Sequence, residues 1–238
     1  MARWAATLTG NLFLVAGSLV CATVACLVAW IPPRGDWMFH VARFWGRGLL
    51  AASFVRVGAR FEAELPADRP VVFMANHRSL FDIPALLATL PRQTRFMAKR
   101  SLFQIPLFGW SLWAGGFIPV DRKDRSTARA TFKQAAERLR RGTSVLIFPE
   151  ETRALDHRLL PFRPGGFLLA MKGGADIVPV GVRGTLEIQR KGSLWVRPGR
   201  VEIAYGRPIS LAGYSVGDKR ALLAEVRERI AELAGAEL

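Results

Sequence analysis

Cysteine and histidine are scarce in this chain of 238 residues. Cys21 and Cys26 both lie in an apolar run, and a spacing of five residues on a helix would point them about 140° apart. Neither a disulfide framework nor a zinc cluster can be built from two such residues. The three histidines, His40, His77 and His157, lie far apart and lack the spacing of metal ligands. We therefore expect no metal site.

A nucleotide-binding motif and a catalytic motif are also absent. The chain has no glycine-rich phosphate loop of either nucleotide-binding type, so we expect neither ATP nor NAD and no other cofactor. It also has no Gly-x-Ser-x-Gly elbow, which argues against a serine hydrolase. A catalytic base in this chain would have to activate a hydroxyl of a substrate rather than a hydroxyl of the enzyme.

Acidic residues are few compared with basic ones. The chain has 34 Lys and Arg against 19 Asp and Glu, a formal net charge of +15. Such an excess predicts a polyanionic partner: nucleic acid, anionic lipid head groups or an acidic carrier protein. Because half of the residues are hydrophobic, intrinsic disorder is excluded as the main description. Basic and apolar together favour a membrane surface over nucleic acid.

A long uncharged run opens the chain. Residues 5–31 contain no charged side chain, and Pro32 and Pro33 end the run. About 20 apolar residues suffice to cross a bilayer core, whereas the apolar part of a cleaved signal peptide has only about 7–15. We therefore expect a retained membrane anchor, although a buried core helix is the alternative.

A second, amphipathic helix is predicted over residues 37–55. Its apolar residues recur at helical spacing with Arg43 and Arg47 among them, which suits either the membrane interface or packing on the domain. More basic residues follow the first run than precede it, which places the main domain on the cytoplasmic side of a bacterial-type inner membrane. We expect an anchor and amphipathic region over residues 1–60 and an α/β domain over residues 61–238.

Short apolar runs alternate with helical patterns in the second region. The expected strands are residues 71–75, 117–120, 145–148, 177–182 and 201–205. The expected helices are residues 126–141, a segment after Pro164 and a segment from about Asp218 to the end. Strands that alternate with helices predict an α/β fold with a mostly parallel sheet flanked by helices.

Polar clusters follow three of these strands, where ligands collect in open α/β sheets. His77 and Asp82 lie in the first cluster. On a straight helix or strand they would point apart, so they meet only if the chain turns between them. If they meet, Asp82 would orient His77 as a general base; the alternative is that His77 only caps or packs. Arg122 and Arg153 follow the other strands, and their guanidinium groups suit a phosphate or carboxylate.

Four blocks in fixed order make the chain resemble the glycerophospholipid acyltransferase family, typified by bacterial 1-acylglycerol-3-phosphate acyltransferases. The resemblance covers about residues 70–185. The matching residues are Asn76, His77, Ser79 and Asp82 in the first block, Gly116, Ile118 and Arg122 in the second, Phe148, Pro149, Glu150, Thr152 and Arg153 in the third, and Val178, Pro179 and Val180 in the fourth.

The resemblance implies acyl transfer from acyl-CoA or acyl carrier protein to the free hydroxyl of a lyso-lipid, giving phosphatidic acid from 1-acylglycerol-3-phosphate, with no acyl-enzyme. His77 would be the base and Asp82 would orient it. The residues implied to bind or shape the substrate site are Asn76, Ser79, Arg122, Glu150, Thr152 and Arg153. Membrane lipids are implied partners, and nucleic acid is not.

One departure from the family pattern matters more than two milder ones at Ala154 and Arg163. Glu151 stands where the third block has glycine, which would permit a positive φ or a close approach of a ligand. A second carboxylate beside a phosphate site should weaken the binding of a dianion. This leaves open an acceptor with a positive group, such as lyso-ornithine lipid. A non-catalytic basic membrane-binding protein is the alternative from another class, and a nucleic-acid binder would explain only the charge.

Overall fold

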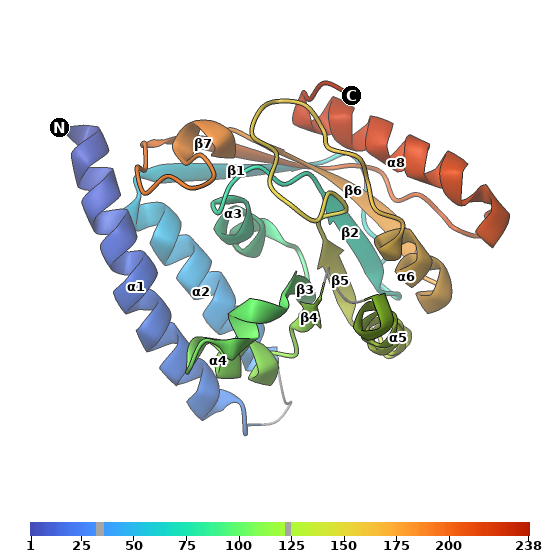
Figure 1. Cartoon of the computed structure of the whole chain (residues 1–238), viewed down its shortest axis with the longest axis horizontal. Helices are drawn as coiled ribbons and strands as arrows, with labels where there is room; N and C mark the ends of the chain where they lie inside the picture. Colours follow the sequence, from blue (N-terminus) through green and yellow to red (C-terminus); the bar gives the residue numbers. More distant parts are fainter. Residues whose placement is uncertain (32–35, 122–124) are drawn as a thin grey trace.

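A seven-stranded sheet forms the centre of the computed structural model, which describes residues 1–31, 36–121 and 125–238. The strand order is β1-β7-β6-β2-β5-β3-β4 (Figure 1). In chain order the strands are β1 (Val55–Phe61), β2 (Val71–Ala75), β3 (Thr94–Lys99), β4 (Ile118–Val120), β5 (Ser144–Ile147), β6 (Asp176–Arg183) and β7 (Gly199–Tyr205). From β6 to β4 neighbouring strands are parallel, and β7 pairs antiparallel with β6 and parallel with β1. The predicted α/β fold with a mostly parallel sheet is confirmed.

Helices cover both faces of the sheet (Figure 1). They are α1 (Ala2–Val28), α2 (Asp36–Ala52), α3 (Asp82–Thr89), α4 (Phe108–Ala114), α5 (Arg125–Arg140), α6 (Gly165–Gly173), α7 (Thr185–Ile188) and α8 (Lys219–Ala234), with 3₁₀ turns η1 (Arg100–Gln104) and η2 (Val216–Asp218). Helices α2 and α3 lie on one face with α1 outside α2, and α5, α6 and α8 lie on the other.

Strand β2 shows how the two faces make two cores. All five of its residues are fully buried. Val71, Phe73 and Ala75 join the core under α2 and α3, whereas Val72 and Met74 join the core under α6 and α8. A parallel strand covered on both faces reads as an unbroken apolar run, which is why the sequence predicts β2 so clearly.

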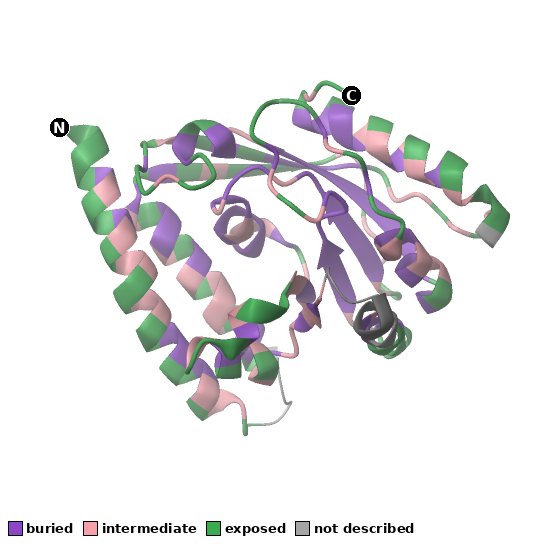
Figure 2. Cartoon of the chain, viewed as in Figure 1, coloured by how far each residue is buried: buried purple, intermediate pink, exposed green. Residues whose placement is uncertain are grey.

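Helix α1 is long and apolar enough to cross a membrane by length and composition. Only 17% of its most apolar 18-residue stretch is buried, so a core helix does not account for it, and its outer face is exposed (Figure 2). Its other face packs on α2 and α4. Near its start, the backbone N–H of Val196 donates to Thr7 Oγ1 at 3.0 Å, which ties the helix to a loop of the α/β domain.

Helix α2 packs closely against its neighbours. It lies between α1 and α3, and Met38, Phe39, Leu49 and Leu50 on it are buried. The sequence left two interpretations open for residues 37–55, the membrane interface or packing on the domain. The structure shows packing, while Trp37 and Phe44 remain exposed.

Two strands were not predicted from the sequence. Val55 begins β1 rather than ending a helix, and β1 continues to Phe61 across the expected boundary between residues 60 and 61. Strand β3 was also missed, because Arg95 interrupts its short apolar run and Lys99 ends it. The boundary itself stays a prediction.

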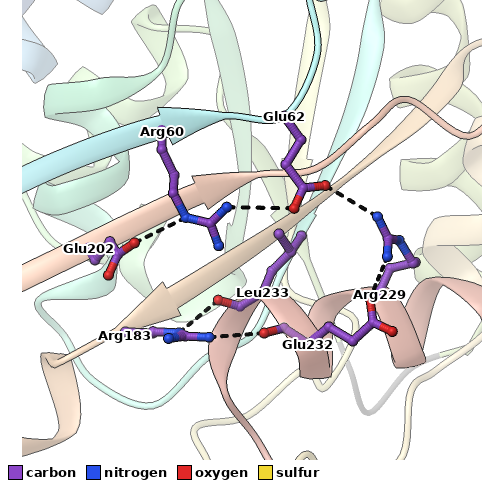
Figure 3. A network of polar contacts seen from close by, with 7 residues as sticks. All are labelled: Arg60, Glu62, Arg183, Glu202, Arg229, Glu232 and Leu233. Carbon is purple, nitrogen blue, oxygen red and sulfur yellow. Dashed lines mark hydrogen bonds and ion pairs between the residues drawn. The ribbon is translucent and has the colours of Figure 1, made fainter.

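A polar network ties the free edge of the sheet to α8 (Figure 3). Arg60 on β1 donates to Glu202 on β7 at 3.1 Å and lies 3.5 Å from Glu62. Arg229 on α8 donates to Glu62 at 3.2 Å. Arg183 on β6 donates to the carbonyl oxygens of Leu233 and Glu232 at the end of α8, at 2.8 and 3.0 Å. These contacts hold α8 beside the reversed strands β1 and β7.

Candidate active site

The loop between β2 and α3 brings His77 and Asp82 together. Strand β2 ends at Ala75 and α3 begins at Asp82, so the chain turns between the two residues. Nδ1 of His77 lies 2.7 Å from Oδ2 of Asp82. An ionised Asp82 accepts a hydrogen bond from the N–H at Nδ1, which leaves Nε2 as the basic nitrogen of the ring. This is the arrangement of a general base and its orienting carboxylate.

Asp82 is fully buried, and its Oδ2 has three donors. Besides His77, the backbone N–H groups of Arg78 and Ser79 donate to it at 2.7 and 2.9 Å. A buried carboxylate needs such partners, and the first turn of α3 adds the favourable end of a helix dipole. The carboxylate is therefore held in one position, and it holds the imidazole.

The imidazole of His77 is packed and only slightly open to solvent. It stacks on Phe148, with ring centroids 4.0 Å apart and planes 19° from parallel, and its side chain is 13% exposed. Phe148 directly follows β5, which is the parallel neighbour of β2. The polar clusters after these two strands therefore do meet at one edge of the sheet.

Glu150 is buried and bonded to the backbone, and its expected role in the substrate site stays a prediction. It is 3% exposed, and its two oxygens accept from the backbone N–H groups of His77 at 2.7 Å and Leu160 at 2.9 Å. Burial raises the pKa of Glu150 to about 7, and the two backbone hydrogen bonds and the nearby Arg78 oppose that rise. Glu150 thus joins the loop that carries His77 to the segment that follows β5.

Arg78 is a buried site residue that the sequence did not single out. It is 3% exposed, and its Nη2 donates to the carbonyl oxygen of His157 at 2.6 Å. It faces Glu150 as a positive charge. Because arginine is common in this chain, the residue type alone did not distinguish Arg78 from other arginines. The signal that could have found it is its position directly after His77.

Asn76 and Ser79 hold the loop in place. The amide of Asn76 donates to the carbonyl oxygen of Val182 at 2.9 Å and accepts from the N–H of the same residue at 2.7 Å. It thereby continues the pairing of β2 with β6 by one residue. Ser79 Oγ donates to the carbonyl oxygen of Gln189 at 2.7 Å. Both side chains are fully buried, so they position the loop, and the expected contact with substrate stays a prediction.

The remaining expected residues lie on the segment after Glu150 or outside the described residues. Within the described part of the chain, Arg153 is partly exposed and has no hydrogen-bond or ion-pair partner. Thr152 is exposed, and Lys191 donates to its hydroxyl at 3.1 Å. Arg122 lies outside the residues that the structure describes.

Glu151 adopts a left-handed backbone conformation, with φ of +57°. Glycine adopts this conformation freely, whereas a side chain disfavours it by about 1–2 kcal/mol. A glutamate in place of the family's glycine therefore adds backbone strain at this position.

Replacing Glu151 with glycine is expected to stabilise the protein by about 1 kcal/mol, because it removes the strain at positive φ. The melting temperature should rise by about 2–4 °C. Glu151→Ala is the control, because it removes the carboxylate and keeps the strain. Equal melting temperatures for the two variants would show that the strain is not present in solution.

The fold can be compared with that of a solved structure. The fold is similar to that of the crystal structure of the 1-acyl-sn-glycerophosphate acyltransferase PlsC from Thermotoga maritima, with a TM-score of 0.81, 24% identity and coverage of 97% of this chain and 95% of that chain. By its fold, the chain is therefore an α/β protein with the architecture of PlsC.

The family follows from the sequence comparisons. The model of the acyltransferase family matches residues 56–183. A 1-acyl-sn-glycerol-3-phosphate acyltransferase of Haemophilus influenzae is 30% identical over 242 residues, covering 94% of this chain and 95% of its own. The chain belongs to the acyltransferase family.

Algal and plant relatives are longer. A 1-acyl-sn-glycerol-3-phosphate acyltransferase of Chlamydomonas reinhardtii is 40% identical over 139 residues, which are 58% of this chain and 42% of that relative. The chain spans about half the length of the algal and plant relatives it matches.

Proposed function

We propose that this protein transfers a fatty acyl group from a thioester, acyl-CoA or acyl carrier protein, to the free hydroxyl of 1-acylglycerol-3-phosphate. The product would be phosphatidic acid. The observation that carries the proposal is the 2.7 Å contact of His77 Nδ1 with the buried Asp82, in a chain that belongs to the acyltransferase family. Its relatives in Chlamydomonas reinhardtii and Haemophilus influenzae are named for this acceptor, which supports the choice.

In the proposed reaction, Nε2 of His77 takes the proton of the acceptor hydroxyl as the hydroxyl oxygen attacks the thioester carbonyl. Asp82 stabilises the imidazolium that forms. The carbon–sulfur bond then breaks, and the imidazolium returns its proton to the thiolate. The new ester and a free thiol leave, and no group of the enzyme is acylated.

Direct transfer makes a kinetic prediction. Mixing the protein with acyl-CoA alone should release no burst of thiol, and thiol release should begin only when the lyso-lipid is added. A thiol-reactive chromophore in a stopped-flow instrument measures both. A burst of about one thiol per protein without acceptor would show an acyl-enzyme and overturn the mechanism.

Arg153 is proposed to hold the anionic head group of the acceptor, together with Arg122. In its favour, Arg153 is partly exposed and has no partner within the described residues. Its guanidinium can bind two phosphate oxygens at once.

Arg153→Gln is therefore expected to lower kcat/KM for 1-acylglycerol-3-phosphate by about 10- to 100-fold, mainly through KM, because a charge-assisted hydrogen bond is lost. Arg153→Lys should recover part of the loss. Arg56→Gln, an exposed arginine on β1, is the matched control. A loss no larger than that of the control would remove Arg153 from the binding site.

Glu151 leaves a second acceptor as an alternative. This residue directly follows Glu150 in the sequence and is partly exposed. It would favour an acceptor with a positive group, such as lyso-ornithine lipid. Glu151→Gly and Glu151→Ala should both shift the preference toward the phosphate acceptor if its charge sets the preference.

The membrane is the proposed location, with the α/β domain on the cytoplasmic side. In support, the outer face of α1 exposes large apolar side chains, among them Trp4, Leu8, Leu12 and Val15. Leu155, two residues after Arg153, is 71% exposed. Both lipid substrates would reach the site from the bilayer.

A further inference from the structure

A basic pocket lies at the start of α1, and its lining includes neither His77 nor Asp82. It has a volume of about 250 Å³ and is lined by the start of α1, by His157, by α7 and by the loop that follows α7. Three arginines contribute to its wall: Arg3, Arg190 and Arg197. All three are exposed.

The three guanidinium groups have no acidic partner in the described part of the chain. The carboxylate of Glu187, which also lines the pocket, is 3.3 Å from Nε2 of His157. The three arginines outnumber this one carboxylate, so the pocket has an excess of positive charge, and an anion bound among the arginines relieves their mutual repulsion. Guanidinium groups match the geometry of phosphate oxygens.

The walls of the pocket are held in place by α1. Thr7 Oγ1 accepts from the N–H of Val196 at 3.0 Å, and Asn11 donates to the carbonyl oxygen of Leu194 at 2.9 Å. Trp4 packs edge-on against Trp195, with ring centroids 4.4 Å apart. The pocket is therefore built by the contact of α1 with this loop.

The position of the pocket indicates the kind of anion. Arg3 lies over the ring of Trp195 at 4.8 Å, directly before the apolar outer face that begins at Trp4. Leu194 is 76% exposed beside it. Tryptophan and arginine at the end of an apolar surface are typical of the head-group level of a bilayer. A volume of about 250 Å³ is at or below the lower limit of pockets for whole small-molecule ligands, so it suits one head group.

We infer that this pocket binds the phosphate of an anionic membrane phospholipid, at a site separate from the acceptor site. The lipid would hold the start of α1 and the loop of residues 189–197 at the head-group level. The same loop accepts the hydrogen bond of Ser79 at Gln189, so the bound lipid would also orient the His77 loop toward the bilayer.

Flotation of the 238-residue chain with vesicles tests the inference. The probes are vesicles of phosphatidylcholine alone and of phosphatidylcholine with phosphatidylglycerol. The variant Arg3→Gln/Arg190→Gln/Arg197→Gln should bind the anionic vesicles about 100-fold more weakly, the loss expected for three charges at an anionic surface. The control Arg56→Gln/Arg200→Gln/Arg220→Gln removes the same charge from exposed arginines of β1, β7 and α8 and should lose less than about 5-fold.

Equal losses in the two triple variants would show that diffuse charge rather than the pocket binds the membrane, and would overturn the inference. Binding of inorganic phosphate at the pocket with unchanged flotation would assign it to a soluble anion and overturn the lipid. Acyl transfer in detergent micelles should be the same for the pocket variant and the wild type. A chain with no acyl transfer on any acceptor would refute the proposed function and leave the flotation result standing.

Discussion

His77→Ala is expected to reduce kcat for acyl transfer by about 10²- to 10⁴-fold. This is the usual contribution of a general base. In this account no other side chain of the described residues takes the place of His77 as the base. Because His77 does not hold the head group in this account, KM for the lyso-lipid should change little. Rates of product formation with purified protein and acyl-CoA measure both constants.

Asp82→Asn is expected to act in the same direction, with a loss of about 10²- to 10⁴-fold. The amide keeps the shape of the carboxylate, but it cannot stabilise the imidazolium and can reverse the donor role at His77 Nδ1. His40→Ala is the matched control, because His40 is an exposed histidine on α2. Full activity in Asp82→Asn would contradict the assignment of Asp82 as the orienting group.

Glu150→Ala is expected to lower the free energy of unfolding by about 2–4 kcal/mol and kcat by about 100-fold. The carboxylate accepts from the N–H groups of His77 and Leu160, and each buried N–H left without a partner is unfavourable by about 1–3 kcal/mol. A loosened His77 loop also misplaces the base, and a displacement of about 1 Å suffices for a loss of that size. Glu151→Ala, the adjacent carboxylate, is the control.

The pH dependence of stability gives a separate test of Glu150. Burial raises its pKa from 4.5 to about 7, so between these pH values the folded protein holds a proton that the unfolded chain releases. The free energy of unfolding contributed by this group therefore falls as the pH rises from about 4.5 to 7, by about 3 kcal/mol. Chemical unfolding of wild type and Glu150→Gln at pH 5 and pH 8 should show this fall only in the wild type. An equal fall in both proteins would assign it to other groups.

The sequence predicts the parts of the fold in which every residue has one role. Strand β2 is apolar on both faces and was found at its bounds, and β5 and β6 were found within one residue at each end. Strand β1 escaped prediction because one of its faces is polar and solvent-exposed, with Arg56 and Arg60 between the apolar residues. The predicted helix ended at Val55, which is the first residue of this strand.

The contact of His77 with Asp82 could be anticipated, because a turn between a strand and a helix is the one way to bring them together. The inward direction of Glu150 could not be anticipated, since a glutamate after a strand suits a substrate site equally well. Its role depends on two backbone N–H groups, of His77 and Leu160, that no residue type reveals. The same holds for Asn76, whose amide pairs with the backbone of Val182 more than 100 residues away.

Acyl transfer by membranes that contain this protein tests the central claim most directly. Product mass would be measured after membranes with wild type or His77→Ala receive acyl-CoA, with 1-acylglycerol-3-phosphate and lyso-ornithine lipid supplied side by side. The account predicts phosphatidic acid in the wild type and its loss in the variant. Product from lyso-ornithine lipid alone would assign specificity to Glu151. Equal product in wild type and His77→Ala would contradict His77 as the base, and no product with either acceptor would favour a non-catalytic membrane-binding protein.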